Sequence, residues 1–453
     1  MNIESLRNKI YKTFFEKPEP LFIFEDIILP AATVWVGVRE WIKFFRMNSL
    51  SEGDRVYLSM SPKPTFIYVL LASFWERISL VIDSTELENE NSVQEYDCTI
   101  GIQTIENRYN VKIDENSGLP FNDTIVKREY RLEKSNGILL FLKTSGSTNN
   151  PKLIGLSEEN IISVLDSHIP LLGKKNSSML SILPWHHAFG LIIDLLSGMF
   201  ESSLIVRDVS NGKDPIKQIE QIKRWNLDSV SGVPLQFDRI LSSIEGDSTL
   251  QKIRSGVIGG SNITSRLASI LDGTNIQVGY GQTEASPGIT LGKRGYFKEN
   301  YLGSPVGCDM SISSENELLF TGKNVYRARL EAESLVWMNE SRIQATNDLV
   351  EQRQDGLYFL GRKDFSFKLE NGTLMIPELI ESDLKKKFIE LEEIVIQKKE
   401  STIQIYYHSG INLDSKIFAY MKKFGSIKII NWEKEFPKDK KGLINRKFFS
   451  NLV

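Results

Sequence analysis

The sequence predicts an α/β fold, because segments with the pattern of buried strands alternate with segments that have a helical spacing of apolar residues. Residues 50–58 suggest a turn followed by a strand, and residues 79–83 form a short apolar run. Between them, residues 64–77 repeat apolar side chains with helical periodicity. Strand, helix and strand in this order are typical of a βαβ unit in a parallel sheet. The alternation returns over residues 201–258, so we expect a large α/β region with sheet-bearing subdomains.

The last part of the chain predicts a smaller α+β domain. Helical periodicity over residues 376–389 is followed by strand patterns at 393–396 and 403–407. A second helix is expected over residues 413–424 and a final strand over 427–431.

Two stretches give weaker signals. Residues 1–50 offer candidate helices and no recognisable chemistry. Residues 84–135 are polar and poorly patterned, which favours short strands and loops.

The composition is that of an ordinary globular protein. Of the 453 residues, 41% are hydrophobic and 25% are charged, as in average soluble domains. The net charge of -3 does not indicate a nucleic-acid partner. Cys98 and Cys308 lie far apart and outside any CxxC or Cys/His cluster. Their placement argues against a zinc site or a disulfide framework and is typical of a protein in a reducing compartment.

No stretch has the pattern of a secretion signal or a membrane span. The N-terminal residues mix acidic and basic side chains and lack the apolar core of a signal peptide. The apolar runs Phe66–Trp75 and Leu191–Phe200 are too short to cross a bilayer. We therefore expect a cytoplasmic protein.

A hydroxyl-rich loop over residues 144–152 has the chemistry of a polyphosphate site. Backbone N–H groups and hydroxyls donate to phosphate oxygens, and a lysine adds a mobile positive charge. The loop is not a Walker A loop, because no GxxxxGK[ST] occurs there. A polar surface turn between two strands is the alternative. The candidate phosphate-binding residues are Thr144, Ser145, Gly146, Ser147, Thr148 and Lys152.

A second motif follows the strand pattern at residues 276–280. An aromatic ring such as Tyr280 at a strand end can stack on a base. Thr283 can donate to a phosphate, and the Glu284 carboxylate is a suitable oxygen ligand for Mg²⁺. A core tyrosine followed by a helix-capping threonine is the alternative.

Two further stretches combine turn signals with candidate pocket residues. Residues 184–190, with the sequence PWHHAFG, predict an irregular passage from a strand to a helix. Two adjacent histidines make a poor metal site, and a histidine in an apolar setting is more often a satisfied core residue. Gly259-Gly260-Ser261 ends another strand pattern, where glycine permits close approach to a ligand. A plain tight turn is the alternative there.

In their order along the chain, these motifs resemble those of the adenylate-forming superfamily of acyl-CoA synthetases, peptide-synthetase adenylation domains and beetle luciferases. The resemblance extends over about residues 50–446. It implies that residues 144–152 hold the phosphates of ATP and that Gly259, Gly260 and Ser261 cover one face of the adenine. It also implies that Tyr280 and Gly281 bind the nucleotide, that Thr283 orients the α-phosphate, and that Glu284 holds Mg²⁺.

The same resemblance implies an acid pocket. His187 and Gly190 match the family's Pro-x-x-His-x-x-Gly segment, which lines the carboxylate and acyl site. Trp185 and Phe189 would flank that segment as an aromatic wall, and Gly279 would complete the pocket. An apolar or aromatic carboxylic acid is the implied substrate, with Lys152, Thr283, Glu284 and His187 as the catalytic residues.

Further matches imply a ribose site and a hinge. Residues 346–348 resemble the family's Thr-Gly-Asp segment with Asn347 in place of glycine, so Asp348 would accept hydrogen bonds from the ribose hydroxyls. Arg362 would also contact the ribose. Asp364 would be the hinge between an adenylation domain at residues 1–362 and a mobile C-terminal lid at 363–453.

The implied reaction is formation of an acyl-adenylate from MgATP, followed by transfer of the acyl group to coenzyme A or to the phosphopantetheine of a separate carrier protein. One departure from the family pattern bears on it, because Leu443 stands where the family has a lysine that bridges the carboxylate and the α-phosphate. The alternatives are therefore a ligase with a non-thiol acceptor and a catalytically impaired nucleotide-binding homologue.

Overall fold

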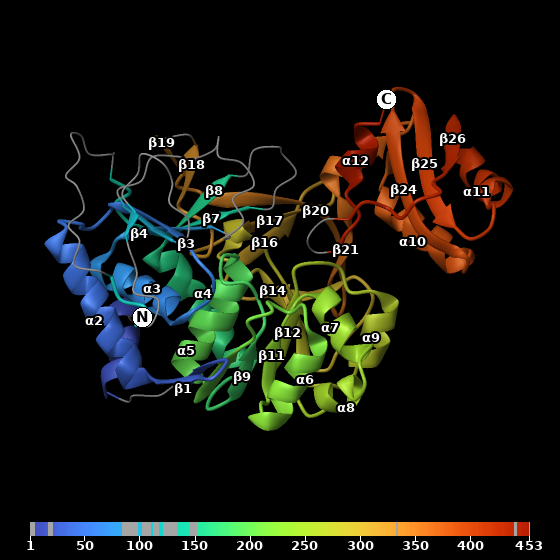
Figure 1. Cartoon of the computed structure of the whole chain (residues 1–453). Coiled ribbons are helices and arrows are strands. Elements are labelled where there is room, and N and C mark those ends of the chain that lie inside the picture. Colours follow the sequence, from blue (N-terminus) through green and yellow to red (C-terminus); the bar gives the residue numbers. More distant parts are fainter. Residues whose placement is uncertain are drawn as a thin grey trace. The chain divides into compact units, whose positions relative to one another are not determined.

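A computed structural model describes most of the chain (Figure 1), namely residues 5–16, 21–83, 98–101, 110–111, 117–120, 134–144, 152–331, 334–438 and 442–452. Contacts within the chain divide it into two compact units. The first contains Met1–Glu299, Gly303–Asp309 and Phe320–Gln344, and the second contains Asn300–Leu302, Met310–Leu319 and Ala345–Val453. Both units combine helices with sheets, so the predicted α/β class is confirmed. The second unit begins upstream of the predicted boundary, and a break at residues 362 and 363 remains a prediction.

The first sheet of unit 1 contains the predicted βαβ element. Strands β3 and β4 pair in parallel on either side of helix α3 in the sequence, as the alternation indicated. Strands β7 and β8 pair antiparallel, and the chain between them is the hydroxyl-rich loop. In sheet order the strands are β19 (Ser334–Trp337), β18 (Ala328–Glu331), β8 (Leu153–Ser157), β7 (Ile138–Lys143), β4 (Ser79–Asp83), β3 (Arg55–Ser59), β5 (Cys98–Gly101) and β6 (Asn110–Val111).

The second sheet includes two strands that the sequence did not predict. Where only helices were expected, β1 and β2 form an antiparallel pair, and β1 also pairs in parallel with β10. That partner lies far along the chain, so no local pattern signals the pairing. The order is β11 (Ser229–Ser231), β9 (Ser178–Ser181), β10 (Leu204–Arg207), β1 (Leu21–Phe24) and β2 (Ile27–Pro30).

A third group of strands, which lies in unit 1 except for the first residues of β15, carries the Gly259 and Tyr280 motifs. Strand β12 pairs in parallel with β13, which places Gly259 beside Gly279. Strand β13 then pairs antiparallel with β14, and β14 with β15. The bounds are β12 (Gly256–Gly259), β13 (Ile276–Tyr280), β14 (Thr290–Leu291) and β15 (Tyr301–Pro305).

The helices of unit 1 follow the expected segments after residue 50. The helix predicted over residues 64–77 is present as α3, and the alternation expected over residues 201–258 includes helix α6. Among the helices that the structure describes, none has the length and apolar character needed to cross a bilayer. The helical elements are α1 (Leu6–Tyr11), η1 (Lys12–Glu16), α2 (Ala31–Met47), α3 (Pro64–Glu76), α4 (Glu158–Leu172), η3 (Phe189–Leu196), α5 (Ser197–Glu201), α6 (Pro215–Arg224), α7 (Pro234–Leu241), α8 (Gly246–Leu250), α9 (Ser265–Leu271) and η4 (Thr283–Ala285).

Unit 2 contains the predicted helix–strand–strand–helix arrangement. Strands β24 and β25 pair antiparallel and β26 joins β25 in parallel, with α10 and α11 before and after the hairpin. Upstream, β20 pairs antiparallel with β21. The bounds are β16 (Asp309–Ile312), β17 (Glu317–Thr321), β20 (Ile343–Arg353), β21 (Gly356–Arg362), η5 (Lys363–Phe365), β22 (Phe367–Lys368), β23 (Leu374–Met375), α10 (Pro377–Lys387), β24 (Leu391–Lys399), β25 (Thr402–Ser409), α11 (Asp414–Met421), η6 (Lys422–Phe424), β26 (Ile427–Asn431) and α12 (Arg446–Ser450).

Two asparagines, one of them the Asn347 that stands where the resemblance has a glycine, adopt glycine-like backbone conformations. Asn316 and Asn347 both have φ of +65°, in the left-handed region that asparagine tolerates better than most other residues. The substitution at Asn347 therefore preserves the local chain path.

Helix α4 begins with a reciprocal cap. The Ser157 hydroxyl accepts from the Asn160 backbone N–H at 3.3 Å, and the Asn160 side chain accepts from the Ser157 N–H at 2.8 Å. The Asn160 amide also donates to the carbonyls of Lys323 and Val325, both at 2.7 Å. The cap therefore fixes the start of α4 and also holds the segment from Lys323 to Val325 beside it.

We expect Ser157→Ala to lower the free energy of unfolding by about 1 kcal/mol, since one capped N–H loses its acceptor. Urea denaturation of both proteins measures the loss. Ser269→Ala on the exposed face of α9 is the control and should change stability less. Equal effects of the two substitutions would show that the cap contributes nothing specific.

Candidate active site

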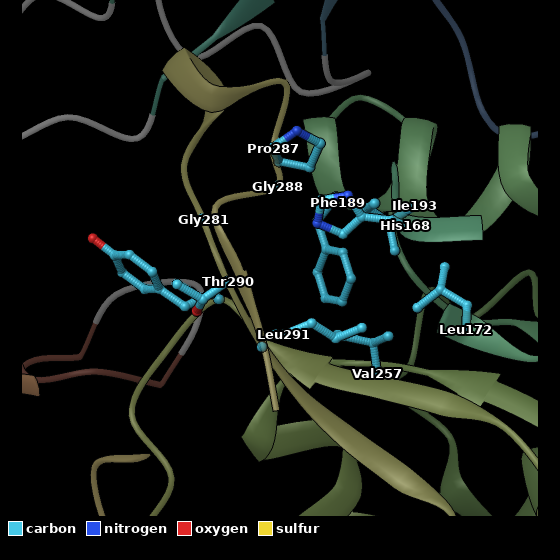
Figure 2. A pocket seen from close by; sticks show the side chains of 14 residues that line it. His168, Leu172, Phe189, Ile193, Val257, Gly281, Pro287, Gly288, Thr290 and Leu291 are labelled. Carbon is cyan, nitrogen blue, oxygen red and sulfur yellow. The ribbon is translucent and has the colours of Figure 1, made fainter. Parts of the chain in front are cut away.

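An apolar cavity that is partly open to solvent lies in unit 1, and the empty space of about 430 Å³ there includes the solvent at its mouth. Figure 2 shows residues of helices α4 and η3 on one side of it and residues of β12, β14 and the segment after β13 on the other. Most of the lining residues either have apolar side chains or are glycines. The lining residues are His168, Leu172, Phe189, Ile193, Val257, Gly259, Gly260, Gly279, Tyr280, Gly281, Pro287, Gly288, Thr290 and Leu291.

Several residues that the sequence assigned to a binding site meet at this cavity. Phe189 and Gly279, predicted for the acid pocket, both line it. So do Gly259, Gly260, Tyr280 and Gly281, which were predicted to bind the nucleotide. The 184–190 passage and the Tyr280 motif, which lie far apart in the sequence, therefore both contribute to the lining of one cavity.

Of the two aromatic residues predicted to flank the acid pocket, Phe189 lines this cavity and Trp185 does not. Trp185 is 2% exposed and does not line this cavity; it packs edge-on against Phe24 with the ring centroids 6.1 Å apart. Its indole N–H donates to the Ser181 hydroxyl at 3.1 Å. A tryptophan with a satisfied N–H and close aromatic packing has the environment of a core residue. Trp185 therefore lies outside the lining of this cavity, and its place in the acid pocket stays a prediction.

His187 is exposed and lies outside the lining of the cavity, on the passage that leads into η3. Its ring centroid is 4.3 Å from that of His186. Its backbone N–H donates to the Pro184 carbonyl at 3.3 Å, and its carbonyl accepts from Leu191 at 2.9 Å. The structure therefore places His187 before the first turn of the helix that supplies Phe189, and its catalytic role stays a prediction.

Glycines at the cavity allow the chain to approach itself closely. A Cβ at Gly281 would lie 1.5 Å from the Pro287 carbonyl oxygen, and one at Gly259 would lie 2.3 Å from the Gly279 oxygen. Both distances are far below van der Waals contact. The sequence indicated close approach of a ligand at the Gly259-Gly260 pair, and in this fold the neighbouring backbone of Gly279 already occupies the space beside Gly259.

The ends of the hydroxyl-rich loop are described, whereas its centre is not. The Thr144 N–H donates to the Lys152 carbonyl at 3.0 Å, which closes the β7–β8 hairpin. Lys152 is exposed at the start of β8. The candidates Ser145, Gly146, Ser147 and Thr148 lie outside the described residues.

Beyond Tyr280 the chain enters the short helix η4, which begins with Thr283 and Glu284, both partly exposed. The Glu284 carbonyl accepts from the Tyr326 N–H at 2.9 Å. Within the described residues, no group of three His, Cys, Asp or Glu side chains could hold a metal. One carboxylate fits a Mg²⁺ that takes its other ligands from water and from substrate phosphates. Ser261, half-buried just after β12, follows the two cavity glycines.

The ribose and hinge candidates lie together in unit 2. The Arg362 guanidinium donates to the Asp348 carboxylate at 2.9 Å and lies 3.7 Å from that of Asp364. The Arg362 N–H donates to the Glu378 carboxylate at 3.1 Å. Burial raises the pKa of Glu378. Sequence reasoning missed Glu378, which holds the backbone where β21 ends.

Three buried charged residues lie together at η3, and sequence reasoning did not identify them. Lys174 donates to the Ile193 carbonyl at 2.9 Å and lies 3.9 Å from the carboxylate of Asp194. Arg207 donates to the carbonyls of Ser181 and Leu183 at 2.7 and 2.8 Å. Burial lowers the pKa of Arg207 to about 10, which leaves it charged at neutral pH. An aspartate inside the apolar run 191–196 was the available signal.

Comparison with known proteins places this geometry in context. The sequence model of the AMP-binding enzyme family matches residues 76–324. Long-chain-fatty-acid–CoA ligase 1 of Cavia porcellus is 23% identical over 342 residues, which cover 61% of this chain and 46% of that ligase. The chain thus spans less than half the length of this relative.

Two solved structures share the fold over nearly the whole chain. O-succinylbenzoate coenzyme A synthetase (MenE) from Bacillus subtilis, in complex with AMP, has a TM-score of 0.78 at 17% identity, with 98% of both chains covered. ATP-bound MatB from Rhodopseudomonas palustris has a TM-score of 0.80 at 15% identity, also with 98% of both chains covered. Since the family match takes in more than half of the chain, including the 184–190 passage and the Tyr280–Glu284 motif, the protein belongs to the AMP-binding enzyme family.

Proposed function

We propose that this protein activates a carboxylic acid with MgATP as an acyl-adenylate and transfers the acyl group to the thiol of coenzyme A. The observation that carries the proposal is the position of strand β13. Its end supplies Gly279 and Tyr280 to the apolar cavity, and the chain continues within four residues to Thr283 and Glu284. An acid in the cavity and a nucleotide on that motif would therefore meet at one strand end.

The first step joins the acid to the nucleotide. A carboxylate oxygen attacks the α-phosphorus of ATP, the new O–P bond forms, and the bond to the β-phosphate breaks to release pyrophosphate. Lys152 and the hydroxyl-rich loop stabilise the charge on the leaving pyrophosphate, while Thr283 orients the α-phosphate. Glu284 holds Mg²⁺, which neutralises phosphate charge. Asp348 and Arg362 bind the ribose.

The second step transfers the acyl group. The acceptor thiol loses its proton and its sulfur attacks the acyl carbonyl carbon, so that a C–S bond forms and AMP leaves as the C–O bond breaks. Coenzyme A is the proposed acceptor, and the phosphopantetheine of a separate carrier protein is the variant that presents the same thiol. Rotation of a lid domain about Asp364 between the two steps belongs to this proposal.

The cavity favours an acid with an apolar body. Leu172, Ile193, Val257 and Leu291 contribute aliphatic surface, and Phe189 contributes an aromatic ring. Apolar surface of this kind binds by removing hydrocarbon from water. Aliphatic and aromatic acids both meet this requirement, whereas small polar acids do not.

Incubating the purified protein with MgATP and a panel of carboxylic acids tests the proposal. We expect acid-dependent pyrophosphate release, an acyl hydroxamate when hydroxylamine is present, and an acyl-CoA thioester when coenzyme A is added. Adenylation without any thioester would favour the non-thiol acceptor. Nucleotide binding without pyrophosphate release from any acid would favour the impaired homologue and contradict the proposal.

Tyr280→Ala should weaken ATP binding by about 1–3 kcal/mol, because a stacked aromatic face contributes that much to holding a base. Tyr280→Phe is the matched control, since it keeps the ring and removes the hydroxyl only. Calorimetric titration with ATP measures both variants. Equal ATP affinity of the alanine variant and the wild type would exclude Tyr280 as the adenine platform.

Leu443→Lys tests the departure at Leu443, where the family pattern has a lysine. Leu443 is 44% exposed, so a longer charged side chain can be accommodated there. If the lysine reaches the acid and the α-phosphate, the rate of pyrophosphate release should rise by as much as about 10²–10³-fold. This is the rate change that follows the loss of one hydrogen-bond donor to the transition state. Transfer from a supplied acyl-adenylate should change less.

Leu443→Met, which adds no charge, is the control for that substitution. Lys440 and Lys441, two other candidates for the same role, lie outside the described residues, and alanine at both tests them. Ordinary adenylation by the wild type that neither Leu443→Lys nor the double alanine alters would mean that another residue supplies the charge.

A further inference from the structure

One nitrogen-bearing side chain interrupts the apolar lining of the cavity. His168, on the last turns of α4, is 3% exposed and lines the cavity together with Leu172, Phe189 and Ile193. In Figure 2 its ring lies close to Phe189 and to the Pro287–Gly288 segment. The catalytic steps proposed above do not use this histidine.

The hydrogen bonds of His168 fix its tautomer. Its Nδ1 lies 3.2 Å from the Val164 carbonyl oxygen, which can only accept, so Nδ1 carries the hydrogen. The Ser167 hydroxyl is 3.0 Å from the same nitrogen and donates its own hydrogen to the Ser163 carbonyl at 2.7 Å. The other nitrogen, Nε2, is therefore left with a lone pair.

The Nε2 acceptor is buried and has no hydrogen-bond partner among the described residues. Burial lowers the pKa of His168 to about 4, so at neutral pH the imidazole is uncharged and cannot relieve this state by taking up a proton. Buried polar atoms are usually hydrogen-bonded, so an unpaired acceptor beside a cavity suggests that a bound molecule completes it.

The chain opposite His168 is shaped around this edge of the ring. A Cβ at Gly288 would lie 2.4 Å from both Nε2 and Cε1 of His168, so any other residue would displace the imidazole. The Asn324 amide donates to the Gly288 carbonyl at 2.7 Å and holds that segment in place. The Val164 carbonyl therefore holds the ring at Nδ1, and Gly288 packs against the ring beside Nε2.

We infer that His168 Nε2 accepts a hydrogen bond from the acid itself, so that the cavity selects carboxylic acids whose apolar body carries a hydroxyl or N–H group. This inference rests on the proposed function and deepens it by naming the substrate class. A site with a buried acceptor discriminates against a ligand that lacks the donor, because the acceptor is then left unpaired after water is excluded. An apolar wall alone gives no such discrimination.

Matched pairs of acids test the inference, for example cinnamic and hydroxycinnamic acids, and octanoic and hydroxyoctanoic acids with the hydroxyl at different positions. In at least one pair the hydroxylated acid should have a kcat/KM for pyrophosphate release about 10–100-fold higher in the wild type. His168→Leu should abolish that preference. His168→Gln keeps an acceptor oxygen and should retain part of it.

Leu172→Met, one turn further along α4 and on the same cavity, is the matched control. It changes the shape of the lining but not its hydrogen bonding, so the hydroxyl preference should survive it. Melting temperatures show whether each variant is folded. His168→Gln gives a second reading if the leucine variant unfolds.

Calorimetric binding of the same pairs, measured without turnover, separates the two hypotheses. Absence of pyrophosphate release from any acid would refute the proposed function, while a hydroxyl preference in binding that His168→Leu removes would still support the role of His168. Equal binding and turnover of both members of every pair would overturn the inference. So would a preference that persists in the folded His168→Leu protein, since His168 would then be only a buried core residue.

Discussion

The candidate site depends on three charges buried beneath the helix that forms one wall of its cavity. Lys174, Asp194 and Arg207 are each at most 1% exposed, and ions removed from water are stable only when paired and hydrogen-bonded. Lys174 and Arg207 donate mainly to backbone carbonyls, of Ser181 and Leu183 before the helix and of Ile193 within it. Asp194 accepts from the Ser181 hydroxyl and lies 3.9 Å from Lys174. If the chain between Ser181 and Ile193 moved, a buried charge would lose its partners. The need to keep these charges paired therefore fixes the position of the helix that forms the apolar wall.

The regular part of the fold followed from local patterns, and the remainder required information that is not local. The βαβ unit around α3 and the hairpin of β24 and β25 show apolar periodicity that is readable within about fifteen residues. Strand β1 does not, because its partner β10 is more than 170 residues away. A four-residue apolar stretch becomes a strand only when tertiary structure supplies a neighbour.

At the candidate site, the sequence identified motifs better than it identified surroundings. Phe189, Gly279 and Tyr280 were named from their motifs and do line the cavity. Trp185 was assigned to the same wall, but side chains on either side of a strand-to-helix passage point in different directions, and this one points into the core. His168 lay in an apolar helical stretch with no motif around it, and only the folded structure shows that it lines the cavity with an unpaired Nε2.

The antiparallel pairing of β7 and β8 affects how far the hydroxyl-rich loop between them can vary in length and sequence. Because Thr144 and Lys152 are joined by a backbone hydrogen bond at the end of a buried hairpin, the sheet does not depend on the residues between them for its register. Loop-closure entropy grows slowly with length, by about 0.6 kcal/mol for each doubling. Related chains could therefore exchange or lengthen this loop with little effect on the stability of the sheet that carries it.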